Sequence, residues 1–134
     1  MMFAGLVEDR LAVRELIDSY SGAVMRRDAQ AWSQTWHPQA RWIFRGNTVE
    51  GKDAIVETWI RAMAGFASVM FMAFPSSIEI SGQTARMTTH TFEHLQTLDG
   101  KIILQSGLYY DTAIRDEAGW RFTERSFSAQ ELKL

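Results

Sequence analysis

Apolar residues in the first half of the chain recur at three- and four-residue intervals. This spacing runs through residues 7–27 and again through residues 51–65, and it predicts an amphipathic helix in each stretch. Between them, Asp28 is suited to cap a short helix over residues 29–36, because its carboxylate can accept the free amide hydrogens of a first helical turn. Pro38 ends that short helix. The first half is therefore predicted to be mostly helical.

From Ser68 onward the spacing of the apolar residues changes toward every second position, which is typical of strands. The dipeptide Asp99-Gly100 is a strong hairpin signal. The predicted strands cover residues 40–44, 68–74 with 78–80, 84–97, 101–116 and 120–132. The last three strands then form an antiparallel meander. Helices followed by a curved antiparallel sheet indicate the α+β class, and no linker divides the chain, so residues 1–134 form one domain.

Composition narrows the classes of function. The net charge is −2, and the 14 basic residues are spread along the chain without runs, which argues against binding to nucleic acid. Cysteine is absent, so disulfides and thiol catalysis are excluded. No apolar run approaches the roughly 18 residues that a membrane helix needs. The N-terminal MMFAGLVEDR carries acidic residues too early for a signal peptide, so a cytoplasmic protein without a membrane partner is expected.

Five segments in a fixed order resemble a known family. They read DSYSGAVMRRD, WHPQARWIFRG, EGKDAI, IEISGQTA and GLYYDTAIRDEAGWRFTERSF. Their order and spacing are similar to the SnoaL-like branch of the nuclear-transport-factor-2-like superfamily. The resemblance implies three N-terminal helices packed in the concave face of a strongly curved, mainly antiparallel sheet, a cone-shaped barrel with an internal cavity. Members include polyketide cyclases, ketosteroid isomerase, scytalone dehydratase, limonene epoxide hydrolase and a hexachlorocyclohexane dehydrochlorinase, so the fold alone does not select an activity.

Two residues fall at catalytic positions of ketosteroid isomerase. The resemblance places Tyr20 at its oxyanion-hole tyrosine and Asp111 at its protonated aspartic acid. An aspartic acid that faces an apolar cavity is disfavoured as an anion, so Asp111 could act as acid or base. Tyr109 lies two residues away on the same strand and points to the same face. The alternative is that Tyr20 is a core tyrosine and Asp111 a solvated residue.

The basic residues of these relatives are replaced here. The resemblance puts Phe44 at the isomerase's general-base aspartate, Met25 at the dehydrochlorinase's helix aspartate and Phe71 near its histidine partner. None of these side chains can abstract a proton, so those specific reactions are not expected. With Trp59, they are predicted to contact a hydrophobic ligand instead, although core packing is the alternative for each.

Other titratable residues could supply the missing base. His90 and His94 share one face of a strand, and His90 could act as the base if that face lines the cavity. Their polar neighbours favour the outer face, where both would be solvated or part of an interface. The two histidines would lie about 13 Å apart at the usual strand rise, too far to bind one metal ion.

Glu124 is a candidate second carboxylate. It shares a face with Phe122 under strict alternation, and the register of ketosteroid isomerase suggests that this face looks inward. The alternative is an ion pair with Arg125, Arg121 or a charge on a neighbouring strand.

These residues predict a cofactor-independent and metal-independent enzyme of the lyase or isomerase type. It would act on a hydrophobic cyclic or polyketide-like carbonyl compound, with Asp111, Tyr20 and His90 as catalytic residues. The alternative is a non-catalytic small-molecule-binding module or a dimeric partner that has lost the basic residues of the family. An outward apolar stripe formed by Leu104, Leu108, Tyr110 and Ile114 predicts a homodimer through the outer sheet face.

Overall fold

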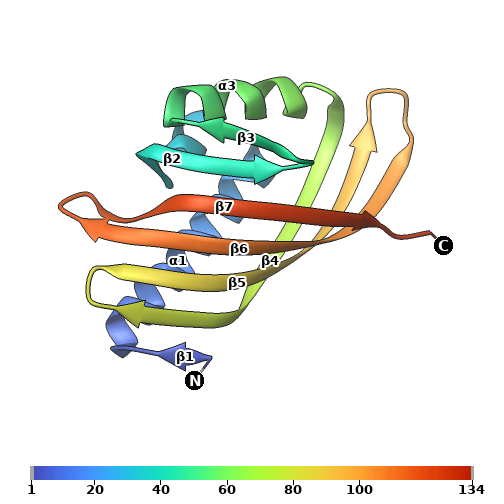
Figure 1. Cartoon of the computed structure of the whole chain (residues 1–134). Helices are drawn as coiled ribbons and strands as arrows, with labels where there is room; N and C mark the ends of the chain where they lie inside the picture. The colour runs from blue at the N-terminus through green and yellow to red at the C-terminus, as the bar shows by residue number, and fades with distance from the viewer. Residues whose placement is uncertain (1, 134) are drawn as a thin grey trace.

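The computed structural model describes residues 2–133, and this part of the chain folds into three helices and a curved seven-stranded sheet (Figure 1). The helices are α1 (Val7–Arg26), α2 (Ala29–Ser33) and α3 (Lys52–Met63). The strands are β1 (Phe3–Ala4), β2 (Trp36–Phe44), β3 (Asn47–Glu50), β4 (Phe66–Ser81), β5 (Thr84–Thr97), β6 (Ile102–Asp116) and β7 (Gly119–Glu131). The α+β prediction is confirmed.

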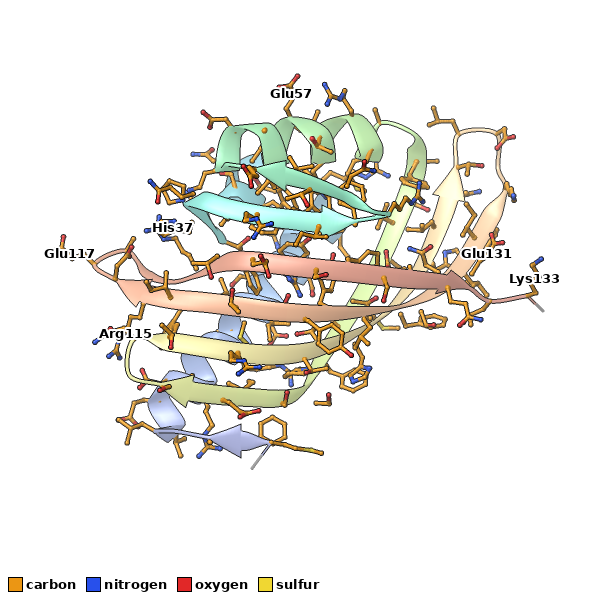
Figure 2. All side chains as sticks on the ribbon, viewed as in Figure 1. His37, Glu57, Arg115, Glu117, Glu131 and Lys133 are labelled. Atoms are coloured by element: carbon orange, nitrogen blue, oxygen red, sulfur yellow. The ribbon has the colours of Figure 1, made fainter. Side chains whose placement is uncertain are left out.

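The sheet order is β1-β4-β5-β6-β7-β2-β3. Strands β4 to β7 form a continuous antiparallel meander, whereas β2 joins β7 and β1 joins β4 in parallel. Helix α1 runs across one face of the sheet, and α3 covers the end formed by β2 and β3 (Figure 1). Figure 2 shows the labelled charged side chains, among them Glu57, Glu117 and Lys133, at the edges of the molecule.

The predicted boundaries hold for the longer elements and fail near the two prolines. Asp28 caps α2 as expected, since its Oδ1 accepts a hydrogen bond of 3.0 Å from the amide of Ala31. However, α2 ends at Ser33, and β2 begins at Trp36 and includes Pro38. Strand β4 continues through Pro75, and its register with β5 shifts there. Such a bulge is one of the few places in a sheet that tolerate a residue without an amide hydrogen, so the proline does not end the strand. The turn predicted after Phe44 is followed by the short strand β3.

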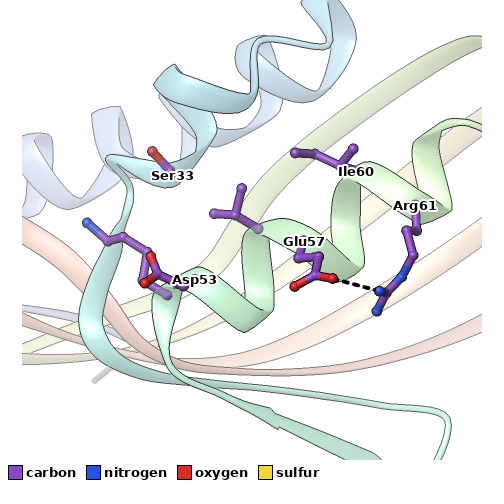
Figure 3. Close-up of a pocket in the computed structure, with 7 residues that line it drawn as sticks. Ser33, Asp53, Glu57, Ile60 and Arg61 are labelled. Atoms are coloured by element: carbon purple, nitrogen blue, oxygen red, sulfur yellow. Dashed lines mark hydrogen bonds and ion pairs between the residues drawn. The ribbon is translucent and has the colours of Figure 1, made fainter.

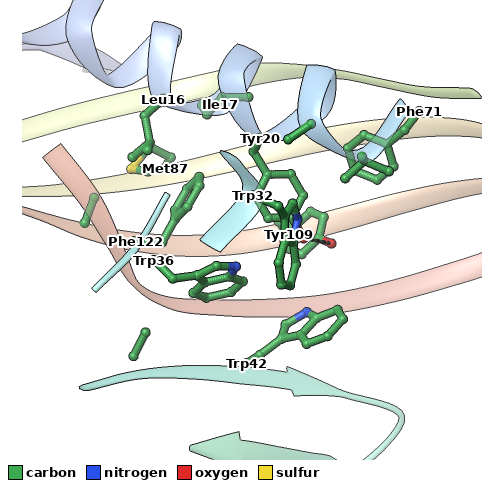
Figure 4. Close-up of a cluster of buried hydrophobic side chains, with 14 of the residues drawn as sticks. Leu16, Ile17, Tyr20, Trp32, Trp36, Trp42, Phe71, Met87, Tyr109 and Phe122 are labelled. Atoms are coloured by element: carbon green, nitrogen blue, oxygen red, sulfur yellow. Dashed lines mark hydrogen bonds between the residues drawn. The ribbon is translucent and has the colours of Figure 1, made fainter. Parts of the chain in front are cut away.

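Aromatic rings fill the space between the helices and the concave face. Trp32, Trp36 and Phe122 are fully buried, and Tyr20 is 2% exposed (Figure 4). The Trp32 ring stacks on Trp59 with centroids 4.5 Å apart, and it lies 5.4 Å from the ring of Tyr20. Rings packed in tilted and edge-to-face arrangements contribute beyond their buried area. They form the apolar wall around the site described below.

An irregularity in β7 sets which of its side chains face this wall. Thr112 pairs with Glu124, but the next residue, Ala113, pairs with Phe122, so one extra residue of β7 is accommodated between them. Such a β-bulge shifts the alternation of the strand by one position. Phe122 and Arg125 are both buried as a result, although they are three residues apart.

Candidate functional site

A buried ion pair lies on the concave face. Asp111 on β6 and Arg125 on β7 stand opposite each other in the ladder and are 3% and 1% exposed. Arg125 donates from Nε to Oδ1 at 2.7 Å and from Nη2 to Oδ2 at 3.1 Å. The hydroxyl of Thr89 on β5 donates to Oδ2 at 2.8 Å. This two-pronged geometry is the strongest form of ion pair available to arginine, so it fixes both side chains.

Three aromatic rings surround the guanidinium. Its central carbon lies 3.7 Å from the ring centre of Tyr109, 4.2 Å from that of Phe122 and 4.4 Å from that of Tyr20. The negative faces of these rings stabilise the cation. Burial is the largest single effect and lowers the pKa of Arg125, but Asp111 and the two tyrosines together outweigh it, so the net direction is upward. Arg125 is therefore a permanent positive charge buried on the concave face of the sheet, and its Nη1 has no hydrogen-bond partner among the described residues.

Two tyrosine hydroxyls meet beside this charge. The oxygens of Tyr20 on α1 and Tyr109 on β6 are 3.3 Å apart. Burial raises the pKa of both phenols, most strongly for Tyr109, and the charge of Arg125 offsets only part of that rise. Both tyrosines are therefore neutral near pH 7. Since one hydroxyl donates to the other, one hydroxyl hydrogen of the pair stays available for a ligand oxygen.

The structure brings Tyr20, Tyr109 and Asp111 together, but with Arg125 between them. Tyr20 and Asp111 both contact the guanidinium from different sides. The carboxylate oxygens of Asp111 are held by Arg125 and Thr89. The expectation that Asp111 faces an apolar cavity is therefore wrong. The cation of Arg125 lies next to it, and the strict alternation of β7 did not predict that position.

His90 lies on the other side of the sheet. Its inward neighbours on β5, Thr89 and Thr91, are buried, whereas His90 is half-buried on the outer face. Its Nε2 lies 2.8 Å from the hydroxyl of Ser76, and its ring stacks on Phe74 with centroids 5.2 Å apart. A catalytic role of His90 beside Asp111 is incompatible with this position, and the outer-face alternative is the one observed.

Glu124 also faces away from the concave face of the sheet. The β7 bulge turns Glu124 outward, where its Oε1 accepts a hydrogen bond of 3.1 Å from Nη1 of Arg41 on β2. The prediction that Glu124 looks inward is wrong because strict alternation does not survive the bulge. Its pairing with a charge on a neighbouring strand matches the alternative reading.

The predicted apolar contacts are distributed along the wall. Phe71 is buried with its ring centre 5.9 Å from that of Tyr20. Phe44 is half-buried and packs on Trp42 at 4.5 Å, and Trp59 stacks on Trp32. Met25 is 39% exposed near the end of α1. Phe71 therefore packs against Tyr20, and Trp59 packs against the Trp32 ring that also lies beside Tyr20.

The sequence reading missed a second buried acid, Glu93. It is 7% exposed on β5, and its Oε2 accepts a hydrogen bond of 3.1 Å from the hydroxyl of Thr91. Burial raises the pKa of Glu93, against the smaller effects of hydrogen bonds from Gln105 and Thr91. The alternation of β5 did contain the signal, because Glu93 has the same parity as the inward Thr89. Arg125 carried no such signal, since only the bulge turns it inward.

Two open grooves lie outside this cluster. One, of about 400 Å³, runs between α2 and α3, where the Glu57–Arg61 ion pair crosses one side (Figure 3). The other, of about 580 Å³, follows α1 beside Thr35 and Trp120. Neither is lined by Tyr20, Tyr109 or Asp111. The internal cavity therefore stays a prediction.

Among residues 2–133, no three or more His, Cys, Asp or Glu side chains form a group that could hold a metal ion. No helix described in the structure is both long and apolar enough to span a bilayer.

Breaking the buried ion pair is expected to destabilise the fold. Arg125→Met and Asp111→Asn each leave one charged group buried without its partner, at an expected cost of about 3–5 kcal/mol in the free energy of unfolding. The double variant Asp111→Asn/Arg125→Met should lose less than the sum of the two. Urea unfolding followed by tryptophan fluorescence measures all three. Single variants within about 1 kcal/mol of wild type would contradict the structural assignment.

Comparison with known proteins places this fold. A protein of Mycobacterium tuberculosis H37Rv, the uncharacterized Rv2910c, is 26% identical over 129 residues, which cover 93% of this chain and 88% of the relative. A candidate aromatic ring hydroxylase from Novosphingobium aromaticivorans superposes with a TM-score of 0.84 at 21% identity, covering 96% of both chains. A hexachlorocyclohexane dehydrochlorinase (LinA, type 2) superposes with a TM-score of 0.82 at 15% identity, covering 95% of this chain and 90% of the other.

The SnoaL-like domain family matches residues 6–126, which include both helix α1 and the Asp111–Arg125 pair. The solved structures of similar shape include a nuclear-transport-factor-2-like protein from Salmonella enterica. The chain therefore belongs to the SnoaL-like domain family.

Proposed function

We propose that the protein is an enzyme of the lyase or isomerase type that acts on a hydrophobic cyclic or polyketide-like carbonyl compound without a cofactor. The observation that carries the proposal is the neutral tyrosine pair held against a buried cation. Tyr20 and Tyr109 meet at 3.3 Å, and both rings contact the guanidinium of Arg125. Donors fixed in a dry site can stabilise a developing oxyanion strongly, because they need no reorganisation when the charge forms.

Each polar residue has a distinct role in this proposal. The free hydroxyl hydrogen of the tyrosine pair would donate to the carbonyl oxygen of the substrate as that oxygen becomes negative. Arg125 would stabilise the same charge through its field. Asp111 and Thr89 act as positioning residues, since their oxygens hold the guanidinium in place. This assigns Asp111 to orienting Arg125 instead of transferring a proton.

Access to the tyrosine pair would depend on the ring of Phe127. This ring is half-buried and lies 4.4 Å from the ring centre of Tyr109. Rotation of Phe127 would expose Tyr109 and offer a flat apolar surface to a cyclic substrate. The name of the structurally similar dehydrochlorinase describes an elimination, which supports the lyase class for this shape of fold.

A non-catalytic binding module is the second candidate. The apolar residues Met25, Phe44 and Phe71, and the tightly packed rings around Trp32, favour it. This candidate predicts a retained ligand that is not converted during long incubation.

A matched pair of tyrosine variants separates the two candidates. Tyr109→Phe removes one hydroxyl of the site, and Tyr110→Phe removes the hydroxyl of its neighbour, which is 60% exposed on the outer face. On a cyclic ketone that the wild type converts, Tyr109→Phe should lower kcat about 10²–10³-fold. Tyr110→Phe should leave kcat unchanged. Full activity of Tyr109→Phe would contradict the role of the tyrosine pair, and a bound but unconverted ligand would favour the binding module.

We also propose that two copies of the chain associate through the outer face of β4, β5 and β6. The apolar side chains exposed there by 40–60% are Met70, Met72, Phe74, Phe92 and Tyr110. An aromatic side chain carries about 150–250 Å² of surface, so these five supply on the order of half of the roughly 800 Å² that each partner buries in a stable complex. The central outward positions of these strands carry no Asp, Glu, Lys or Arg. An apolar face without acidic, lysine or arginine side chains suits a second copy, because a two-fold contact pairs a patch with itself.

A charge placed in this face is expected to produce a monomer. Met72→Glu puts a carboxylate at the centre of the apolar surface, where a second copy would desolvate it. Gln30→Glu adds the same charge on exposed α2 and serves as the control. Light scattering after size exclusion should give a dimer for wild type and the control, and a monomer for Met72→Glu. A monomeric wild type at about 100 µM would overturn the dimer.

A further inference from the structure

We propose that Glu93 is the residue that transfers a proton to and from the substrate. The inference rests on the proposed function and names a base for it. The positions that the family resemblance assigns to acidic or histidine side chains hold Met25, Phe44 and Phe71 here. Glu93 is the remaining carboxyl group on the concave face of the described chain that no arginine or lysine holds.

The position of Glu93 fits a substrate that also reaches the tyrosine pair. Its backbone stands between those of Phe71 on β4 and Gln105 on β6. Tyr109 is four residues further along β6 and on the same inward face, about 13 Å away along the strand at the usual rise. The two long side chains cover part of that distance, and the charge of Glu93 contributes to raising the pKa of Tyr109. A small cyclic molecule could therefore bridge the two groups.

The side chains between Glu93 and Tyr109 on the concave face are small. Ala73, Thr91 and Gly107 lie side by side on the concave face of β4, β5 and β6. A methyl group added at Gly107 would lie within 2.4 Å of the Phe127 ring, so this ring reaches over the small row. Rotation of Phe127 would then open the space between Tyr109 and Glu93. The same ring that covers the tyrosine pair thus covers the path to Glu93.

The chemistry of Glu93 suits proton abstraction next to a carbonyl group. A buried carboxylate without a cationic partner is a stronger base than an exposed one, because burial destabilises its charged form. It would take the proton from the carbon beside the carbonyl, while the C–H electron pair forms a C=C bond and the carbonyl oxygen becomes an enolate oxygen. The protonated Glu93 would then return the proton to another carbon, which isomerises the substrate, or to a departing hydroxyl, which leaves as water. No oxidant or other reactant is required.

The proton abstraction can be tested without knowing the natural substrate. The probe is 2-tetralone, a bicyclic ketone, whose exchange of hydrogens beside the carbonyl for deuterium is followed by ¹H NMR in D₂O. Glu93→Gln keeps the shape and removes the base, and it should slow enzyme-catalysed exchange about 10²–10⁴-fold. Binding of 2-tetralone, measured by tryptophan quenching, should change less than about threefold. The control Glu117→Gln changes an exposed glutamate in the β6–β7 turn and should exchange like wild type.

The pH dependence supplies a readout that a structural role would not move. Exchange requires the carboxylate form, so the rate should rise with pH through a midpoint above the ordinary pKa of glutamate. Gln105 and Thr91 touch the Glu93 carboxyl, and Tyr109 is the titratable group of β6 that its charge reaches. A ¹³C NMR titration of the Glu93 carboxyl should give the same midpoint. This titration does not depend on any substrate.

The outcomes separate the two levels of the proposal. Exchange by wild type that persists in Glu93→Gln would overturn Glu93 and leave the proposed function standing. No exchange by wild type would overturn the proposed function and the role of Glu93 with it. A Glu93 carboxyl that titrates together with the exposed glutamates would overturn the base whatever the substrate.

Discussion

A guanidinium can stay buried among aromatic rings only if its charge is matched there, and Asp111 matches the charge of Arg125. The desolvation of both groups is severe, so their contact must be nearly ideal to offset it. The paired hydrogen bonds of 2.7 and 3.1 Å, and the hydroxyl of Thr89, provide that contact. The β7 bulge is part of the same solution, because it turns Arg125 toward Asp111. The rings of Tyr20 and Tyr109 complete the enclosure.

The proposed chemistry of the site depends on the cation of Arg125. A tyrosine hydroxyl buried among tryptophan rings would otherwise be a weak donor, distant from any positive charge. Contact with Arg125 gives both tyrosines a fixed positive field at the point where a substrate oxygen would become negative. We assign the proton transfer to Glu93 on β5. In this account the base lies on β5, whereas the positions that the family resemblance assigns to basic side chains are the apolar Met25 on α1, Phe44 on β2 and Phe71 on β4.

The sequence predicted the architecture because its periodicities are regular over long stretches. Helix α1 and the strands β5 and β6 were expected almost to their observed ends, and Tyr109 and Asp111 were expected on one face. In β7 the alternation fails, because one extra residue turns Glu124 outward and Arg125 inward. The sequence around Thr123 contains no glycine or proline that would predict the bulge. The inward direction of Glu93 could have been predicted, because Glu93 and Thr89 lie an even number of positions apart on β5. Histidine is the more familiar base, and both histidines of β5 lie on the opposite face.

The most direct test of this account is an NMR measurement on the side chain of Arg125. A guanidinium that is enclosed by three rings and held by Asp111 should show separate, slowly exchanging Nε–H and Nη–H signals at neutral pH and 25 °C. Its Nε–H should also show a contact to the hydrogens of Tyr109. A single averaged signal that exchanges rapidly with water, like those of surface arginines, would show that Arg125 is not fixed in the protein interior. The ion pair would then not organise the site.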